Sequence, residues 1–464
     1  MKDEFVWGVA TSAYQIEGGK FADGKRASIW DEFCKRKNKI QHNHKGDHAC
    51  DFLYHYKNDI QLLKHLGIDN FRFSISWPRV IPFGDGFINH KGLDFYDRLV
   101  DECLKNDINP WITLYHWDLP HALELKGGWT NRDIISWFNR YTEVVAKKLG
   151  DRVKNWMVLN EPVVFTGAGY YLGVHAPGRK GESNYFPALH HTAICQAQGI
   201  KTLKELIKDS HVGTTFSCSH ISPMNANSEK DIIAVNKVDA LINRLFVEPL
   251  FGYGYPIHEL PFLSRLEKYM LPGDNKLIKA TPDFIGIQNY TREVVKHSII
   301  QPVLKAKIVD AKSRNVESTV MNWEVYPESI YEMIKKFNSY RHISKIYVTE
   351  NGAAFKDEVN SNGEINDEKR IKYLRDYIGQ VLRAKEEGMK INGYFLWSLL
   401  DNFEWSEGFA PRFGIVHVNY KNQKRTIKNS GYWYSDFIKQ IKLEEKEKQK
   451  QTLQEVMSVS EQDF

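Results

Sequence analysis

The sequence predicts an α/β protein with a single (β/α)8 TIM-barrel domain, and three observations support this fold class. Eight short apolar runs of strand-like composition recur along the chain. Amphipathic segments with helical spacing lie between them, as in a barrel of parallel strands covered by helices. The chain has 464 residues, enough for one barrel of about 250 residues enlarged by insertions. A doubly wound sheet is the alternative, but no Gly-rich phosphate loop follows the first run.

Most of the eight runs are continuously apolar, a pattern typical of parallel strands covered on both faces. Long connections follow the first, fourth and sixth runs, and we expect insertions on the functional face there. The predicted strands are Phe5–Ser12, Asn70–Ser76, Pro110–His116, Asn155–Glu161, His211–Ser219, Phe284–Tyr290, Lys345–Glu350 and Ile391–Leu399.

Helical periodicity is clearest in three connecting segments, where apolar residues recur at spacings of three and four. The first of these segments ends at Gly67, a residue typical of helix C-termini. The three apolar sets are Phe52, Tyr56, Ile60, Leu63 and Leu66; Ile134, Phe138, Tyr141 and Val145; and Ile371, Leu374, Ile378 and Leu382. We expect the barrel to span residues 1–441, followed by a charged tail, 442–464, that frays or is disordered.

Composition excludes several classes of protein. Hydrophobic residues make up 42% and charged residues 26%, as in globular proteins and unlike disordered chains. The 63 basic and 58 acidic residues are too evenly balanced for a nucleic-acid-binding surface. The sequence has five cysteines without CxxC spacing, and it has no apolar leader and no run of the ~18 residues that a membrane span needs. We therefore expect a cytoplasmic protein with reduced, buried thiols and with neither membrane nor nucleic acid as partner; no pattern predicts its oligomeric state.

Two carboxylates close predicted strands. Glu161 ends the fourth run and Glu350 the seventh, and functional groups of such barrels gather at these strand ends. A facing pair suits glycoside hydrolysis, in which one carboxylate is an ionised nucleophile and the other keeps its proton because burial and the first charge raise its pKa. Arg72 would hold the nucleophile ionised, Tyr290 would donate a hydrogen bond to it, and Asn160 would bind the sugar 2-hydroxyl. A lone strand-end glutamate is as readily a salt-bridge partner or helix cap.

Longer motifs surround these residues and extend the argument beyond the carboxylate pair. The chain resembles glycoside hydrolase family one, the retaining β-glucosidase family, from about Phe5 to Lys439. The matching stretches, which occur in the family's order, are FVWGVATSAYQIEG (5–18), FRFSISWPR (71–79), LYHWDLP (114–120), LNEP (159–162), VTENG (348–352) and WSLLDNFEW (397–405).

The resemblance implies a (β/α)8 barrel, hydrolysis of terminal β-D-glucosyl residues in two retaining steps, and no cofactor or metal. It implies that Glu161 is the acid/base, that Glu350 is the nucleophile and that a small β-glycoside is the binding partner. The remaining roles follow the same resemblance. Gln15, His116, Asn160, Glu404 and Trp405 would hold the terminal sugar; Trp397 would stack on its ring; Trp323 would form the aromatic wall of the leaving-group site; and Phe413 would lie beside the sugar.

Two details refine the expected substrate and one departs from the family pattern. Relatives that hydrolyse 6-phosphoglycosides lack the Glu-Trp pair, which is intact here as Glu404 and Trp405, so an unphosphorylated sugar is favoured. The thioglucosidase branch has Gln where this chain has Glu161, so O-glycosides are favoured. The sixth strand usually ends Asn-Tyr-Tyr but ends Gln288-Asn289-Tyr290 here, a change that we expect to reshape the leaving-group site.

Other candidate metal ligands and nucleophiles are more simply interpreted as loop or packing residues. His42, His44 and His48 share one loop without supporting metal ligands. His190-His191 is more typical of packing than of a ligand set, and Ser217, Cys218 and His220 lack an orienting acid, so Cys218 is expected in the core. Trp30, Trp137 and Trp156 are also expected there. Two competing functions remain: a 6-phospho-β-glycosidase, and a non-catalytic sugar-binding protein on the same fold.

Overall fold

The protein is a closed barrel of eight parallel strands, which confirms the predicted fold class. The computed structural model describes residues 5–460, with the backbone alone for 448–460. Strands run around the barrel in the order β1-β11-β10-β7-β5-β4-β3-β2, so the last strand closes on the first. They are β1 (Val6–Ala10), β2 (Asn70–Ser74), β3 (Asn109–Tyr115), β4 (Asn155–Asn160), β5 (His211–Ser217), β7 (Phe284–Gln288), β10 (Ile346–Asn351) and β11 (Ile391–Trp397).

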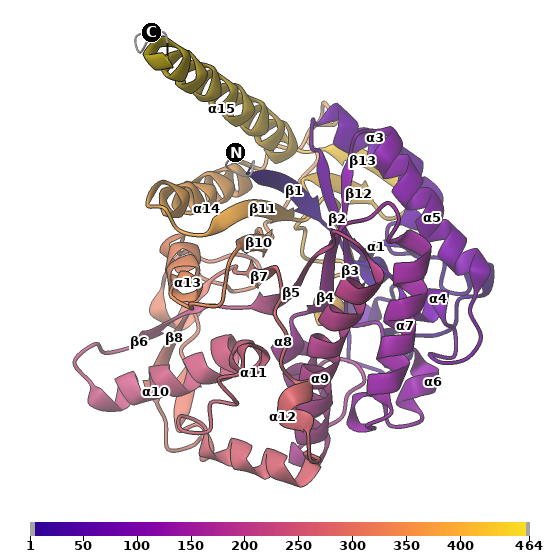
Figure 1. Ribbon diagram of the computed structural model, residues 1–464, viewed down its shortest axis with the longest axis vertical. Helices are drawn as coiled ribbons and strands as arrows, with labels where there is room; N and C mark the ends of the chain where they lie inside the picture. Colours follow the sequence, from indigo (N-terminus) through magenta and orange to yellow (C-terminus); the bar gives the residue numbers. More distant parts are fainter. Residues whose placement is uncertain (1–4, 461–464) are drawn as a thin grey trace.

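Helices surround the barrel, and Figure 1 shows α3, α5 and α7 on one side and α13 and α14 on the other. The apolar faces predicted from helical spacing are turned inward: Phe52, Ile60 and Leu63 are all buried. The covering helices are α3 (Phe52–His65), α5 (His90–Lys105), α7 (Ile134–Leu149), α9 (Glu182–Leu206), α11 (Val247–Phe251), α13 (Glu328–Asn338), α14 (Glu368–Glu386) and α15 (Asn429–Ser460).

The connections carry further elements. The further helices are α1 (Ala13–Ile16), α2 (Ile29–Phe33), α4 (Trp77–Val80), α6 (His121–Glu124), α8 (Pro162–Thr166), α10 (Glu229–Asp239) and α12 (Asp274–Leu277). A small sheet, β6-β8-β9, stands outside the barrel and is built from β6 (His220–Pro223), β8 (Arg292–His297) and β9 (Ala306–Ile308). A hairpin pairs β12 (Val416–Asn419) with β13 (Lys424–Ile427).

The strands end earlier than the apolar runs do, except β10, which extends one residue further to Asn351. Register shifts fall between Met157 and Asn160 on β4 and between Val348 and Glu350 on β10. Such irregularities redirect side chains and end pairing. Polar residues that follow the runs therefore turn out of the strand ladder into the mouth of the barrel.

Aromatic side chains fill the barrel interior below its mouth. Trp111 lies 5.1 Å from Tyr347 and 5.1 Å from Phe395 between ring centroids. Gly213 leaves room for the neighbouring Phe284 ring, because a Cβ atom there would lie 2.5 Å from it. The barrel is thus a packed core on which the mouth is built.

A network of buried charges joins the loops after β10 and β11 to the start of α15. The Lys428 ammonium donates to Asp357 at 2.5 Å and to Asp401 at 2.7 Å. Asp357 also forms an ion pair with Arg370 at 2.9 Å, and Asp401 forms one with Arg412 at 2.9 Å. Since Asp401 Oδ1 accepts the Gly414 amide as well, at 3.1 Å, the network holds both loops against the barrel.

Helix α15 continues into the segment that we expected to fray. Its backbone is helical to Ser460, and it projects away from the barrel in Figure 1. Ion pairs join α15 to residues of the barrel domain, from Lys442 to Asp69 and from Glu445 to Lys385, the latter at 2.7 Å. Residues 442–460 are thus helical in the structure. The division into a domain over 1–441 and a tail that frays or is disordered stays a prediction.

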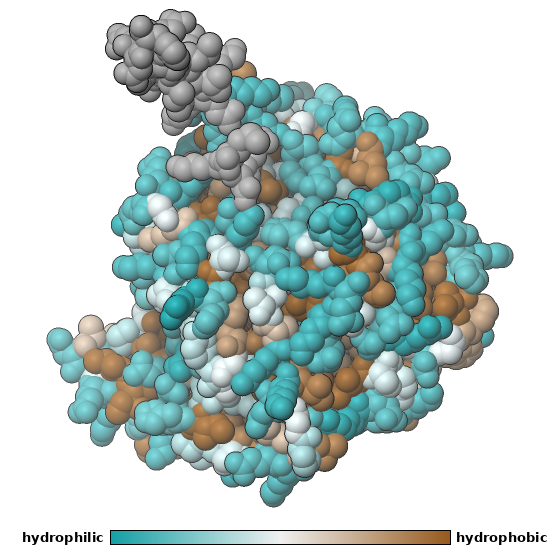
Figure 2. Space-filling view, viewed as in Figure 1, coloured by the Kyte–Doolittle hydropathy of each residue, from teal (hydrophilic) through white to brown (hydrophobic). Residues whose placement is uncertain are grey.

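Hydrophilic residues cover most of the face shown in Figure 2. Within residues 5–460, no helix combines the length and apolar character needed to cross a membrane. All five cysteines are buried as free thiols, and Trp30, Trp137 and Trp156 are buried, as predicted.

Replacing Lys428 with methionine should destabilise the protein by about 3 kcal/mol, because removing one partner leaves buried carboxylates undercompensated. Chemical denaturation followed by circular dichroism measures this free energy of unfolding. The exposed Lys421 offers a matched control, and Lys421→Met should change the value by less than about 0.5 kcal/mol. Equal stabilities of the two variants would contradict the role assigned to the network.

Candidate active site

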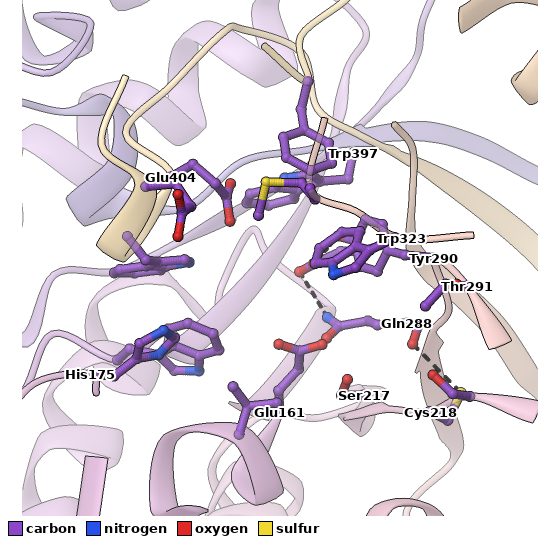
Figure 3. A pocket seen from close by; sticks show the side chains of 18 of the residues that line it. Glu161, His175, Ser217, Cys218, Gln288, Tyr290, Thr291, Trp323, Trp397 and Glu404 are labelled. Carbon is purple, nitrogen blue, oxygen red and sulfur yellow. Dashed lines mark hydrogen bonds between the residues drawn. The ribbon is translucent and has the colours of Figure 1, made fainter. Parts of the chain in front are cut away.

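A cavity of about 280 Å³ opens at the C-terminal ends of the barrel strands. Figure 3 shows Glu161 and Glu404 projecting toward it from different elements. Most of the site residues predicted from the sequence line this cavity, whereas Gln15, Arg72 and Asn160 lie directly behind its wall. The predicted residues in the lining are His116, Glu161, Tyr290, Trp323, Glu350, Trp397, Glu404, Trp405 and Phe413.

Three side chains donate hydrogen bonds to the Glu350 carboxylate. Arg72 Nη1 and Gln288 Nε2 reach Oε1 at 2.5 and 2.8 Å, and the Tyr290 hydroxyl reaches Oε2 at 2.7 Å. Burial raises the pKa of Glu350, while the Arg72 charge and these hydrogen bonds oppose that shift. The donors leave the ionised carboxylate oriented toward the cavity.

Glu161 stands in a different environment on the same cavity. It follows the last residue of β4 in the left-handed conformation, with φ 47°, immediately before Pro162 and α8. Burial and the charge of Glu350 raise the pKa of Glu161 well above its usual range, with Ser217 and Arg72 opposing the shift. Arg72, Gln288 and Tyr290 all donate to Glu350, so Glu350 is the carboxyl that is stabilised in its ionised form. The charge of Glu350 then favours the protonated form of Glu161.

Asn160 sits under the cavity floor, fully buried. Its Oδ1 accepts from Arg72 Nη2 at 2.6 Å and from Gln288 Nε2 at 2.6 Å. Because Oδ1 is an acceptor, Nδ2 is the donor to His116 Nε2, at 3.0 Å. Burial and the Arg72 charge lower the pKa of His116 well below its usual range, so the ring is neutral. The amide that was expected to meet the sugar is thus engaged within the protein.

Aromatic rings close one end of the cavity. Trp405 packs on Trp117 with ring centroids 4.5 Å apart and on the buried Trp30 at 4.6 Å. His116 stacks on Trp405 and on Trp397, 5.9 Å from each. This end therefore offers flat apolar faces and is blocked behind by packed rings, a shape that suits one terminal ring of a ligand.

Glu404 is the carboxyl at this closed end. Burial raises the pKa of Glu404 to about 8, and the charges of Glu350 and Glu407 add to the effect. Gln15 Nε2 lies 3.5 Å from its Oε2 and donates to the Phe403 carbonyl at 2.9 Å. Gln15 therefore holds the loop that carries Glu404 and does not itself line the cavity.

The other end of the cavity carries a second aromatic group. Trp323 lies 5.2 Å from Tyr290 and 6.0 Å from Phe413 between ring centroids. Phe413 shares one buried apolar cluster with Trp397, and Tyr290 and Trp323 pack against that cluster. The place of Phe413 beside the sugar stays a prediction. Thr291 and Cys218 lie at the far side of Figure 3 from Glu404.

Sequence reasoning missed several cavity residues. Gln288, whose departure from the family pattern was expected to reshape the leaving-group site, donates directly to Glu350 and to Asn160. Asn289 lies outside the lining, and its amide donates to Ser329 Oγ at 2.9 Å. Glu293, on β8, and His175 line the cavity from connections between barrel strands, and no strand-end pattern singles them out.

The remaining candidates lie elsewhere or serve packing. His190 is buried, with Asp274 at 2.8 Å and Tyr255 at 3.0 Å. His44 Nδ1 accepts the Phe409 amide at 3.1 Å. Cys218 is buried in the cavity wall, where burial raises the pKa of its thiol. No group of three or more metal-ligating side chains assembles in the part of the chain that the structure describes.

Comparison with known proteins agrees with this geometry. Residues 1–443 match the model of a family described as glycosyl hydrolase family 1. Beta-glucosidase A of Thermotoga maritima is 44% identical over 442 residues, 95% of this chain and 98% of its own. A 6-phospho-beta-galactosidase of Clostridium acetobutylicum is 34% identical, covering 95% and 97%. The structure of a beta-glucosidase from Thermotoga maritima in complex with glucoimidazole superimposes with a TM-score of 0.89 at 43% identity, covering 95% and 99%.

Replacing Glu404 with glutamine should remove a pH-dependent loss of stability. The folded pKa of Glu404 is about 8 against 4.5 in the unfolded chain, so the folded protein binds more protons between these values. The contribution of Glu404 to stability therefore falls as pH rises from about 4.5 to 8. Thermal unfolding across this window should show the Tm of Glu404→Gln rising relative to the Tm of the unmodified protein as pH rises. A gap that stays constant, or that the exposed Glu358→Gln variant reproduces, would contradict the assignment.

Proposed function

This chain belongs to glycosyl hydrolase family 1 and is a glycosidase, and we propose that it removes terminal β-D-glucosyl residues from short oligosaccharides and from aryl or alkyl glycosides. One observation carries the proposal: the surroundings of two carboxyls in a single cavity favour opposite protonation states. Glu350 receives three donors that favour its ionised form, whereas burial and the neighbouring charge keep the proton on Glu161. These are the states that a nucleophile and a general acid require.

The reaction follows from these two states. Glu350 attacks the anomeric carbon while Glu161 donates its proton to the departing glycosidic oxygen, so the leaving group departs as an alcohol. A covalent glycosyl-enzyme forms, and Glu161 is left as a carboxylate. Glu161 then takes a proton from water as the water oxygen attacks the anomeric carbon, which frees Glu350. Two inversions retain the β configuration.

The closed end of the cavity is proposed to bind the terminal sugar. Trp397 and Trp405 present apolar faces to its ring, and Glu404 is available to its hydroxyl groups. Gln15 and Asn160, which lie behind the wall, act by holding Glu404 and His116. Glucose, galactose and fucose present similar hydroxyl groups in different orientations, so we propose glucose as the preferred sugar without excluding the other two from turnover.

The competing functions fit the cavity less well. None of the described residues that line the cavity is Lys or Arg. Five glutamates line it: Glu161, Glu293, Glu350, Glu404 and Glu407. A phosphosugar would meet carboxyls without a cation to pair with. A purely sugar-binding protein has no need of two carboxyls held in different protonation states.

We further propose that the reaction uses no cofactor, since proton transfer and nucleophilic attack come from Glu161 and Glu350 alone. A cytoplasmic location is proposed from the five buried free thiols, because disulfides are rare in reducing compartments. Fractionation of the source cells, with activity in the soluble lysate and none in the medium, tests this location.

A hydrolysis panel tests the proposed function. Nitrophenyl β-glucoside, β-galactoside, β-fucoside and 6-phospho-β-glucoside are compared under one condition, and release should be fast from the glucoside and absent from the phosphosugar. Glu350→Gly should abolish release while keeping the circular dichroism spectrum. Turnover of the phosphosugar alone would refute the assignment of Glu404, and silence on all four substrates would refute hydrolysis.

Replacing Glu161 with alanine should separate substrates by their leaving groups. Hydrolysis of methyl β-glucoside, whose leaving group needs a proton, should fall by about 10²–10⁴-fold in kcat/KM. Hydrolysis of dinitrophenyl β-glucoside should fall far less, because its phenolate leaves unassisted. Steady-state kinetics on both substrates measures the contrast, and equal losses would rule out the acid role.

A further inference from the structure

Glu293 lies on the small sheet outside the barrel, yet it lines the cavity. It belongs to β8, where it is in register with Ile221 of β6. Thr291, two residues earlier, lines the cavity too, and Figure 3 places Thr291 at the end remote from Glu404. Glu293 therefore belongs to the end of the cavity that Thr291 lines, remote from Glu404.

The carboxylate of Glu293 has no partner within residues 5–460, although two arginines lie nearby. Glu324 takes both of them. Arg292 donates to it twice at 2.9 Å, and Arg314 donates at 2.7 Å. Glu293 is half-buried and faces the cavity with its acceptor oxygens uncommitted. The Glu293 oxygens are not among the fully buried polar atoms that lack a partner, so they remain accessible from the cavity, where a ligand hydroxyl group can donate to them.

The neighbouring polar groups at this end are already engaged. The Thr291 hydroxyl lies 3.0 Å from the Glu324 carbonyl and 3.1 Å from the Arg292 carbonyl. The Cys218 thiol donates to the Gln288 carbonyl at 3.6 Å. Burial raises the pKa of Glu293 to about 7, with Arg314 opposing and Glu324 adding to the shift. Both forms of this carboxyl accept a hydrogen bond from a hydroxyl group.

We propose that Glu293 determines leaving-group specificity by accepting hydrogen bonds from the hydroxyl groups of a second sugar. The inference rests on the proposed hydrolysis and adds the chemistry of its leaving group. A sugar leaving group brings several hydroxyl donors to this end of the cavity. A nitrophenyl group brings a flat ring for Trp323 and no donor, so it makes no use of Glu293.

Two substrates that share the terminal glucose test the inference. The kcat/KM values for cellobiose and for nitrophenyl β-glucoside are measured on the unmodified enzyme, Glu293→Ala and Glu293→Gln, with the exposed Glu358→Gln as control. Glu293→Ala should lose about tenfold or more on cellobiose and twofold or less on the nitrophenyl substrate. Glu293→Gln, which keeps an acceptor oxygen, should lose less than Glu293→Ala on cellobiose. Glu358→Gln should match the unmodified enzyme on both substrates.

The two proposals fail in different ways. The inference is overturned if the unmodified enzyme releases nitrophenol and the Glu293 variants keep its ratio of kcat/KM for cellobiose to kcat/KM for nitrophenyl β-glucoside. The proposed hydrolysis would then still hold. Equal losses on the two substrates overturn it too, because they show a role in folding or in the shared chemistry. An unmodified enzyme that hydrolyses neither substrate overturns both proposals together.

Discussion

The buried guanidinium of Arg72 is the constraint on which the catalytic face depends. It reaches Glu350 on β10 with one nitrogen and Asn160 on β4 with another, and its third donor lies 3.0 Å from Met157 Sδ. A guanidinium with no exposed surface is stable only if it is paired and hydrogen-bonded. The barrel therefore has to bring these strand ends together around Arg72, and the carboxylate that neutralises it is the one proposed to attack the sugar.

This arrangement lets one cavity hold carboxyls with different tasks. Glu350 and Glu161 are both removed from water, but Arg72, Gln288 and Tyr290 converge on the first. The second has Ser217 and the more distant Arg72 as its stabilising influences. Proton affinity is set here by which strand end carries the donors. The packed aromatic interior below keeps those strand ends in fixed register.

Much of the fold followed from pattern alone, because eight apolar runs and helical spacing are properties of local sequence. The strand-end positions of Glu161 and Glu350 were readable for the same reason. The side-chain contacts could not be predicted in this way, because they depend on distances between strands. Gln288 donates to Glu350 and to Asn160. The Asn160 amide is hydrogen-bonded to Arg72 and to His116. Glu293 escaped notice since its strand belongs to an added sheet, whose position over the mouth only the assembled chain reveals.

The filled barrel interior also determines the order in which molecules enter and leave the cavity. Below the carboxyls the space is taken by Trp111, Phe395 and their neighbours, and behind Trp405 it is taken by packed rings. In the proposed reaction, substrate and water therefore share the passage beside Trp323. The leaving group must vacate that passage before water arrives, and the released sugar, seated deepest, departs last. Free sugar in the medium enters by the same route and occupies the position that the next substrate needs, so the geometry by itself makes the product a competitor of the substrate.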